Sequence, residues 1–420
     1  MSGYRWPGSA GSVANRDTTR LRSGGLGAGS PLRARATLAA AEPRPGRVTR
    51  LWRSDWILWA AVLSLSALGV LLVAAATKPF NPVHPFATAE HQVLFLGVGL
   101  VMALVAAVID YPAIRSSAPV LYALAILGLL ATFAIGSSVA GAKAWISLGG
   151  GLEIQPSEFA KLAVIVLAAM LFNAKREQRL EVGDVDVFRA LVLMAIPMGI
   201  VLLQNDLGTT LVMLTIMFGV LAIGGAPRRW LVGLTLLGAI GAGVVLKLHL
   251  LSGYQQARIT AFLHPNSGTQ DYGYNAYQAR VAIGSGGIHG TGLFHGSQIN
   301  DGYVYAAHTD FIFATAGEEL GFIGAALIVA LITIIIWRGL RIAARAPDLF
   351  GRVVAAGVVC WLAFESFENI GMNLGIMPIT GIPLQFVSYG GSSLFASMLA
   401  IGLLQNVHIQ SQAGPGPAAD

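Results

Sequence analysis

The chain has 420 residues, of which 55% are hydrophobic and only 11% charged, and its formal net charge at pH 7 is +6. Ordinary soluble domains carry about 25% charged residues, so this composition excludes such a domain and indicates a polytopic membrane protein. The single cysteine, Cys360, excludes a disulfide framework and a cysteine metal site.

The first segment, residues 1–54, is rich in Gly, Ser and Ala and carries ten arginines against two acidic residues. It lacks the apolar residues that a core requires, so we expect a disordered, Arg-rich cytoplasmic tail. An organellar transit peptide is the alternative interpretation. The membrane domain is expected at 55–410, followed by a second disordered tail at 411–420.

Ten apolar runs, close to the length that crosses a bilayer, follow the first tail. The fourth and fifth runs are short, and a tight bend at 204–206 separates the fifth from the sixth. We therefore expect an all-α polytopic membrane protein with ten transmembrane helices. The runs lie at 56–76, 92–109, 119–135, 158–172, 190–203, 207–225, 230–250, 310–337, 353–372 and 386–407.

The lysines and arginines between the runs indicate the orientation of the chain. With the N-terminus in the cytoplasm, most of them fall on the cytoplasmic side, and the outer loops keep four: Lys78, Lys143, Arg258 and Arg280. This asymmetry predicts that both termini are cytoplasmic and that the large loop between helices 7 and 8, 252–307, is extracellular. Basic charge arranged in this way gives no indication of a nucleic-acid partner.

The fourth run begins with QPSEFAK at 155–161, where a proline and a serine are typical of a helix start. Glu158 and Lys161 are three residues apart, so they share one face of that helix. An ion pair at the edge of the hydrocarbon region is costly unless it faces a polar cavity. A structural salt bridge is the alternative.

Further acidic residues are expected near the outer ends of the helices. Asp206 turns the chain back into the membrane, although it could simply cap the sixth helix. Asp310 begins the eighth run, where a carboxylate would stabilise the helix dipole whatever the function. Glu318 and Glu319 point about 100° apart, and Glu318 is expected to face the groove of Asp310. The ninth run adds Glu365 and Glu368.

Two glycine-rich segments complete this outer side. The first, 282–292, suggests close backbone approach and could form an anion-binding nest. The second, 378–393, contains two prolines and ends in SYGGSS. Irregular backbone at membrane depth is tolerated only where it is buried or lines a cavity. Ser388, Gly390 and Gly391 are therefore candidate cavity residues.

Eight motifs follow one another along the chain: QPSEFAK at 155–161, DLGT at 206–209, YQQAR at 254–258, AIGSGG at 282–287, HTDFIF at 308–313, GEELG at 317–321, NIGM at 369–372 and SYGGSS at 388–393. In this order they resemble the motifs of the SEDS family (shape, elongation, division and sporulation), the cell-wall polymerases typified by RodA, FtsW and SpoVE. The resemblance covers 56–407, and the run at 290–298 resembles the RodA form. The bias toward Ala, Gly and Arg suggests a GC-rich bacterium such as an actinobacterium.

The resemblance implies a peptidoglycan glycosyltransferase that polymerises lipid II into glycan strands on the outer face of the bacterial cytoplasmic membrane, for elongation or division. It implies a class B penicillin-binding transpeptidase as the partner. The family's proposed catalytic aspartate falls on Asp310, and its cavity residues fall on Glu158, Lys161 and Asp206. The remaining candidates for the substrate cavity are Arg258, His308, Glu318, Glu319, Ser388, Gly390 and Gly391.

The sequence departs from the family pattern at two arginines. His91 stands where Arg is usual at the entry to the second span, and Ala144 stands where Arg is usual after the third. His91 and the neighbouring Lys143 could replace the lost anion contacts, but less strongly.

The implied reaction is attack by a sugar hydroxyl of one lipid II on the anomeric carbon of a second chain, with inversion and loss of undecaprenyl pyrophosphate. Pyrophosphate leaves without protonation, so one base suffices. We expect Asp310 to be that base, with a pKa raised by desolvation and neighbouring acids. Lys161, Arg258 or a divalent cation such as Mg or Mn could stabilise the leaving group, although no metal-ligand set is legible.

Two other classes of function remain open. A lipid II flippase would also need charges at helix breaks, but with polar residues along a path through both leaflets. A structural scaffold for wall synthesis would leave the acids unexplained. The predicted position of the acids in the outer half favours the enzyme.

Overall fold

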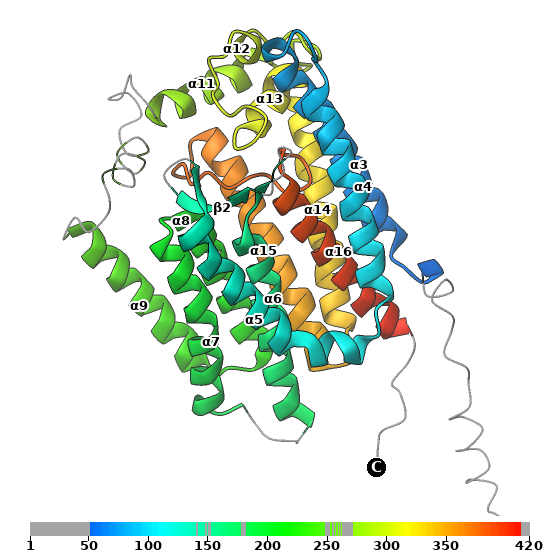
Figure 1. The fold of residues 1–420 in the computed structure, drawn as a ribbon, viewed down its shortest axis with the longest axis vertical. Helices are drawn as coiled ribbons and strands as arrows, with labels where there is room; N and C mark the ends of the chain where they lie inside the picture. Colours follow the sequence, from blue (N-terminus) through cyan, green and yellow to red (C-terminus); the bar gives the residue numbers. More distant parts are fainter. Residues whose placement is uncertain are drawn as a thin grey trace, which may run out of the picture. The chain divides into compact units, whose positions relative to one another are not determined.

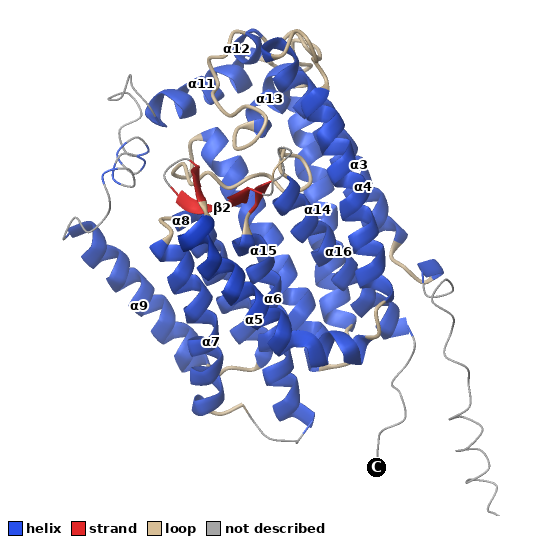
Figure 2. Ribbon diagram, in the orientation of Figure 1, coloured by secondary structure: helices blue, strands red, loops and turns tan. Residues whose placement is uncertain are grey.

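The computed structural model describes residues 51–139, 142–147, 149, 153–177, 182–247 and 272–412, together with positions 253, 256, 258, 260 and 262. These residues form long helices and one small sheet (Figure 1, Figure 2). Most of both predicted tails and part of the loop 252–307 lie outside the described residues, so the predictions for them stay predictions.

The long helices follow the predicted apolar runs. Nine of them are long and apolar enough to cross a membrane, counting only the described residues, and α9 covers most of the seventh run. The all-α polytopic class is confirmed, while the count of ten spans stays a prediction. In chain order the helices are α3 (Trp56–Thr77), α4 (Ala87–Val108), α5 (Tyr111–Ile135), α6 (Pro156–Glu177), α7 (Asp184–Leu203), α8 (Leu207–Gly224), α9 (Arg228–Lys247), α14 (Gly321–Arg345), α15 (Leu349–Leu374) and α16 (Gly391–Gln412).

The fourth and fifth runs form helices of 22 and 20 residues, which are longer than the apolar runs themselves. The added turns are polar, and Lys175 near the end of α6 forms an ion pair with Asp186 at the start of α7, with Nζ and Oδ1 3.1 Å apart. Both helices therefore continue past the apolar stretch by pairing their charges.

The eighth run contains two helices instead of one. A short helix, α13 (Ile312–Glu319), precedes α14, which begins at Gly321 with a left-handed φ of +64°. A side chain on Gly321 would collide with backbone atoms of Ile288 and Gly290. The prediction that this span begins at Asp310 is wrong, because a glycine lets the chain turn and the loop approach the break.

The remaining elements lie in the connections. A three-stranded antiparallel sheet, red in Figure 2, joins α5 to α6, with Ser137 opposite Trp145 and Ile146 opposite Ile154. Figure 1 places this sheet, α11, α12 and α13 near the same end of the spanning helices. The connecting elements are η1 (Lys78–Phe80), β1 (Ser137–Val139), β2 (Ala142–Ser147), β3 (Glu153–Ile154), α11 (Tyr272–Ser285) and α12 (Ser297–Asn300).

Three helices form the centre of the bundle. Protein buries 78% of the apolar window of α6, 72% of that of α15 and 83% of that of α16, against 17% for α5. Polar side chains on the three central helices must therefore find partners inside the protein. Asn406 of α16, for example, donates from Nδ2 to the carbonyls of Ala106, Ala107 and Ile109, where α4 ends.

An ion pair fastens the start of α3. Asp55 caps this helix by accepting from the Leu58 amide at 3.1 Å, and its carboxylate pairs with Arg338 of α14. The side-chain amide of Gln405 exchanges two hydrogen bonds with the Asp55 backbone, at 2.8 and 2.9 Å. The start of α3 is thus tied to α14 and α16.

Gly69 of α3 offers a test of this packing. A Cβ at this position would lie 2.7 Å from the backbone of Phe386 and Val387, and main-chain atoms cannot move aside as a flexible side chain can. We expect Gly69→Ala to lower the free energy of unfolding by about 1–3 kcal/mol. Thermal unfolding of the detergent-solubilised protein measures this.

The matched control is Gly97→Ala on α4, where an added Cβ meets nothing within 4 Å. It should leave the melting temperature unchanged or slightly higher, since alanine favours a helix more than glycine does. Equal losses in both variants would contradict the close approach at Gly69.

Candidate functional site

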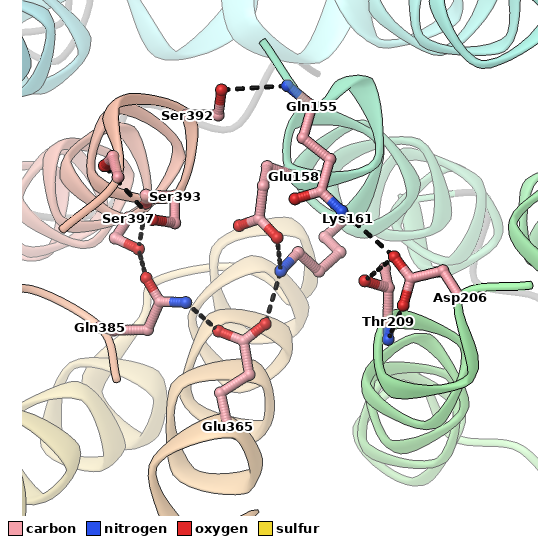
Figure 3. A network of polar contacts seen from close by, with 11 residues as sticks. Gln155, Glu158, Lys161, Asp206, Thr209, Glu365, Gln385, Ser392, Ser393 and Ser397 are labelled. Carbon is pink, nitrogen blue, oxygen red and sulfur yellow. Dashed lines mark hydrogen bonds and ion pairs between the residues drawn. The ribbon is translucent and has the colours of Figure 1, made fainter. Parts of the chain in front are cut away.

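A lysine held between two carboxylates lies among the central helices (Figure 3). Lys161 Nζ of α6 lies 2.8 Å from Glu158 Oε1 and 2.5 Å from Glu365 Oε1 of α15, and the lysine side chain is fully buried. The ammonium also lies 4.5 Å from the centroid of the Trp361 ring, a cation–π contact. The structure contains the expected Glu158–Lys161 pair and adds Glu365 as a second partner.

Two neutral side chains extend the hydrogen bonding of this cluster. Gln385 Nε2 donates to the second oxygen of Glu365, and Ser397 Oγ of α16 donates to Gln385 Oε1 (Figure 3). Two carboxylates face one ammonium, so the amide donor on Glu365 compensates part of the excess negative charge. The network joins α6, α15, α16 and the segment before α16.

Asp206 is the N-cap of α8, as the alternative interpretation predicted. Its Oδ1 accepts from the Thr209 amide at 2.9 Å, and its Oδ2 accepts from Thr209 Oγ1 at 2.8 Å and from Gln155 Nε2 at 3.1 Å (Figure 3). The backbone amide of Gln155 donates to Ser392 Oγ at 3.0 Å. Asp206 therefore joins the starts of α6, α8 and α16.

Asp310 lies two residues before α13 and is half-buried. It is neither the N-cap nor a first-turn residue of that helix, so the helix-dipole interpretation does not account for it. The carboxylate lies beside Gly381: a Cβ there would be 3.4 Å from Asp310 Oδ2 and 3.5 Å from Arg258 Nη2. Arg258 donates from Nη1 to the Thr380 carbonyl at 2.9 Å. A carboxylate and a guanidinium thus meet at one glycine.

Burial raises the pKa of Asp310 to about 6, although the Arg258 guanidinium and a hydrogen bond with Thr309 lower it. Desolvation therefore dominates, as expected from the sequence, whereas the expected influence of neighbouring acids is not found. A carboxyl with a pKa near neutrality is suited to act as a general base.

Ser388 and Tyr389 hold the backbone that carries Asp310. The Tyr389 amide donates to the His308 carbonyl at 2.8 Å, and Ser388 Oγ donates to the Thr309 carbonyl at 2.6 Å. Burial lowers the pKa of His308, which favours its neutral form. The sequence motifs at 308–313 and 388–393 are therefore in direct contact.

Two of the glycine-motif candidates are also found here. Gln92 of α4 donates to the Ser388 carbonyl at 3.0 Å, and the Gly390 amide donates to Gln92 Oε1 at 3.4 Å. Gly391 is the first residue of α16 and lies against the Phe95 ring.

Glu318 and Glu319 have a different role from the one expected. Glu318 accepts from the amides of Gln298 and Ile299, at 2.8 and 3.1 Å, and Glu319 accepts from the amide of Phe294 at 3.1 Å. Both side chains are buried and fasten the large loop to α13. The prediction that Glu318 faces the groove of Asp310 overlooked these donors, which come from a loop docked on α13.

Burial raises the pKa of Glu319 to about 7, an effect opposed by the Phe294 amide and reinforced by the neighbouring Glu318. The pKa of the Glu319 carboxyl, which holds the loop, therefore lies near neutral pH.

Of the proposed substitutes for the two arginines, His91 is exposed and Lys143 is half-buried. His91 is stacked on Phe95, with ring centroids 6.4 Å apart, and Lys143 donates from Nζ to the Phe133 carbonyl at 2.7 Å. Neither contact tests whether the two residues bind an anion.

Sequence reasoning missed several amide side chains. Gln385, Gln92, Asn369 and Asn373 all bond within the site, and none was selected as a site residue. The signal was available for Gln92 and Asn369, which lie inside predicted apolar runs, because a buried amide in such a run is costly unless it is paired.

Metal binding receives no support from side-chain geometry within the described ranges: no group of three or more His, Cys, Asp or Glu residues there could hold an ion. The suggested divalent cation stays a prediction.

The family model for the cell cycle proteins FtsW, RodA and SpoVE matches residues 55–413. The chain belongs to this family. It is 35% identical to the probable peptidoglycan glycosyltransferase FtsW of Trichlorobacter lovleyi, over 87% of this chain and 96% of the relative. It is 38% identical to the peptidoglycan glycosyltransferase MrdB of Escherichia coli, over 76% of this chain and 85% of the relative.

Solved structures share the fold of this family member. One is described as a peptidoglycan synthase complex in which polymerization and crosslinking are coordinated. It matches with a TM-score of 0.70 and 30% identity, over 85% of this chain and 98% of the other. The resemblance inferred from the sequence motifs is thus confirmed at the level of the family.

Replacing the buried lysine of this SEDS protein should lower its stability strongly. Lys161→Met would leave two buried carboxylates without their cation, so we expect a loss of about 3–5 kcal/mol in the free energy of unfolding. Adding Glu365→Gln should recover part of the loss, because it removes one of the two charges. Thermal unfolding in detergent measures both variants, and a double variant less stable than Lys161→Met would contradict the charge argument.

Proposed function

We propose that this chain is a peptidoglycan glycosyltransferase that polymerises lipid II into glycan strands on the outer face of the bacterial cytoplasmic membrane. The observation that carries the proposal is the meeting of the Asp310 carboxylate and the Arg258 guanidinium at Gly381. A base and a cation on one small surface suit a reaction that removes a proton and releases a pyrophosphate. The names of the relatives support the same activity.

The proposed orientation has ten spans, both termini in the cytoplasm and Asp310 at the outer end. Basic residues support it. Those at the start of α5, the end of α6, the start of α9, the end of α14 and the start of α15 lie at the end of the bundle away from α13, which Asp310 precedes (Figure 1). They are Arg115, Lys175, Arg228, Arg229, Arg338, Arg341, Arg345 and Arg352.

An apolar cavity supports the proposal of a lipid-linked substrate. Its volume is about 700 Å³, and side chains of α4, α5, α6 and α16 line it. The lining includes Ile146 and Ile154 of the sheet and Pro156 at the start of α6, so one end approaches the turn that carries Glu158. A polyprenyl chain lying here would bring its pyrophosphate toward the polar end of the bundle.

In the proposed reaction Asp310 removes the proton from the attacking sugar hydroxyl, whose oxygen then bonds to the anomeric carbon of the second chain. The bond from that carbon to undecaprenyl pyrophosphate breaks with inversion. Arg258 is better placed than Lys161 to stabilise the leaving group, because Lys161 is fully buried between two carboxylates. A divalent cation beside the pyrophosphate stays a prediction.

The proposed partner is a class B penicillin-binding transpeptidase. The similar solved structure, a synthase complex that coordinates polymerization with crosslinking, supports a crosslinking partner of this kind.

The test is glycan-strand formation from lipid II by the purified chain with its cognate transpeptidase. We expect Asp310→Asn to lower the rate by about 10²–10⁴-fold, the usual contribution of a general base, while the melting temperature stays close to that of the wild type. Asp301→Asn is the matched control, since Asp301 is an exposed acid near the end of the large loop that precedes Asp310. Normal polymer from Asp310→Asn would overturn the assignment of the base.

The pH dependence of the rate offers a second test. A base must be ionised, so polymerisation should fall as the pH drops through a midpoint of about 6, the raised pKa of Asp310. In Arg258→Gln the cation that lowers this pKa is gone, so the midpoint should move to higher pH. A midpoint near 4, or one that Arg258→Gln leaves in place, would contradict the assignment.

A further inference from the structure

The segment that carries Asp310 has no regular secondary structure to fix it. Ala306 has a left-handed φ of +56°, and its carbonyl accepts turn bonds from the amides of Thr309 and Phe311. Asp310 follows this turn and precedes α13. A helix or strand fixes a side chain through its own ladder of hydrogen bonds, so the position of Asp310 has to be set by other parts of the chain.

Three consecutive carbonyls of this segment accept hydrogen bonds from distant residues. Tyr389 and Ser388 bind the carbonyls of His308 and Thr309, as described above. The carbonyl of Asp310 accepts from two side-chain amides at once: Asn369 Nδ2 at 2.8 Å and Asn373 Nδ2 at 3.1 Å. Asp310 is therefore held by its main chain, while its carboxylate faces Gly381 and Arg258.

The two asparagines lie one turn apart on α15, so they share a helix face. Both are fully buried. Asn373 Nδ2 also donates to the Asn369 carbonyl at 2.8 Å, and Asn373 Oδ1 accepts from the Ala314 amide at 3.1 Å, in the first turn of α13. Asn373 thus gives this amide a second acceptor beside the Phe311 carbonyl, which lies 3.0 Å from it.

Asn369 connects both sides of the proposed reaction site. Its Nδ2 donates to the carbonyl of Ile382 at 2.8 Å as well as to that of Asp310. Ile382 follows the glycine that touches the Asp310 carboxylate, and the carbonyl two residues earlier, that of Thr380, is bound by Arg258. One amide therefore spans the segment of the carboxylate and the segment of the guanidinium.

We propose that Asn369 and Asn373 are positioning residues, which hold the Asp310 main chain against the 380–382 segment so that the carboxylate and Arg258 face the same space. This rests on the proposed function, in which Asp310 is the base. Neither asparagine touches substrate in this assignment, and both act through Asp310.

A third asparagine supplies the matched control. Asn406 of α16 is buried and also bridges carbonyls from one amide nitrogen, those of Ala106, Ala107 and Ile109. These carbonyls belong to the end of α4, at the end of the bundle opposite Asp310. A merely structural role for Asn369 would give Asn369→Ala and Asn406→Ala similar effects.

The experiment compares Asn369→Ala and Asn406→Ala in purified protein with the cognate transpeptidase. For Asn369→Ala we expect kcat to fall about 10–100-fold with KM for lipid II unchanged, the loss usual when a supporting group no longer fixes a reacting one. Asn406→Ala should keep the wild-type kcat, even if its melting temperature falls as much as that of Asn369→Ala.

Hydrogen–deuterium exchange provides a readout that does not depend on activity. In Asn369→Ala the backbone amides of 308–315 should exchange faster, while in Asn406→Ala they should exchange at the wild-type rate. Asn373→Asp is a second variant for the case in which Asn369→Ala does not fold. It keeps an acceptor for the Ala314 amide and removes the donor to Asp310, so it should lower kcat and speed exchange in the same peptides.

Each outcome decides the proposal. Unchanged exchange in 308–315, or faster exchange with an unchanged kcat, would overturn it, as would equal losses of kcat in Asn369→Ala and Asn406→Ala. If the wild type forms no polymer, the proposed function fails; if Asp310→Asn polymerises normally, the assignment of the base fails. In both cases the positioning role for that base falls with it, and the exchange data still show whether the asparagines hold the segment.

Discussion

The structure depends on one buried ion cluster, in which Lys161 of α6 lies between Glu158 and Glu365. Charges at the centre of a membrane protein are costly, and they persist where each finds a partner and further hydrogen bonds. Here the partners come from α6 and α15, and Gln385 continues the network to α16. These three helices, the most buried of the described spanning helices, therefore cannot slide past one another without separating a charge from its partner.

This fixed centre contrasts with the segment that carries Asp310. In the central cluster the lysine is fully buried and neutral donors lie around it, so this cluster is suited to a structural role. Asp310 lies in irregular backbone beside Arg258 and keeps part of its surface open. Gln385 and Ser388, from a single segment, join the two regions, since one bonds to Glu365 and the other to Thr309. The support and the proposed reactive group are thus connected through the 378–393 segment.

Much of this arrangement could be predicted from local patterns. Apolar runs located the helices, the three-residue spacing indicated the Glu158–Lys161 pair, and the position of Asp206 after a bend indicated a cap. Other features depend on contacts between distant residues. Glu365 pairs with a lysine 204 positions away, and the carboxylate of Glu318 is satisfied by amides of a docked loop, which no spacing reveals. The break at Gly321 depends on how closely that loop approaches.

The way Asp310 is held has a consequence for the cell. Its segment is bound through the carbonyls of three residues, so replacing its carboxylate by an amide of the same shape leaves those bonds in place. An inactive Asp310→Asn protein would keep its fold and its outer surface. Under the proposed function it would compete with the active protein for the proposed transpeptidase without making product, and so act as a dominant inhibitor when both are produced together.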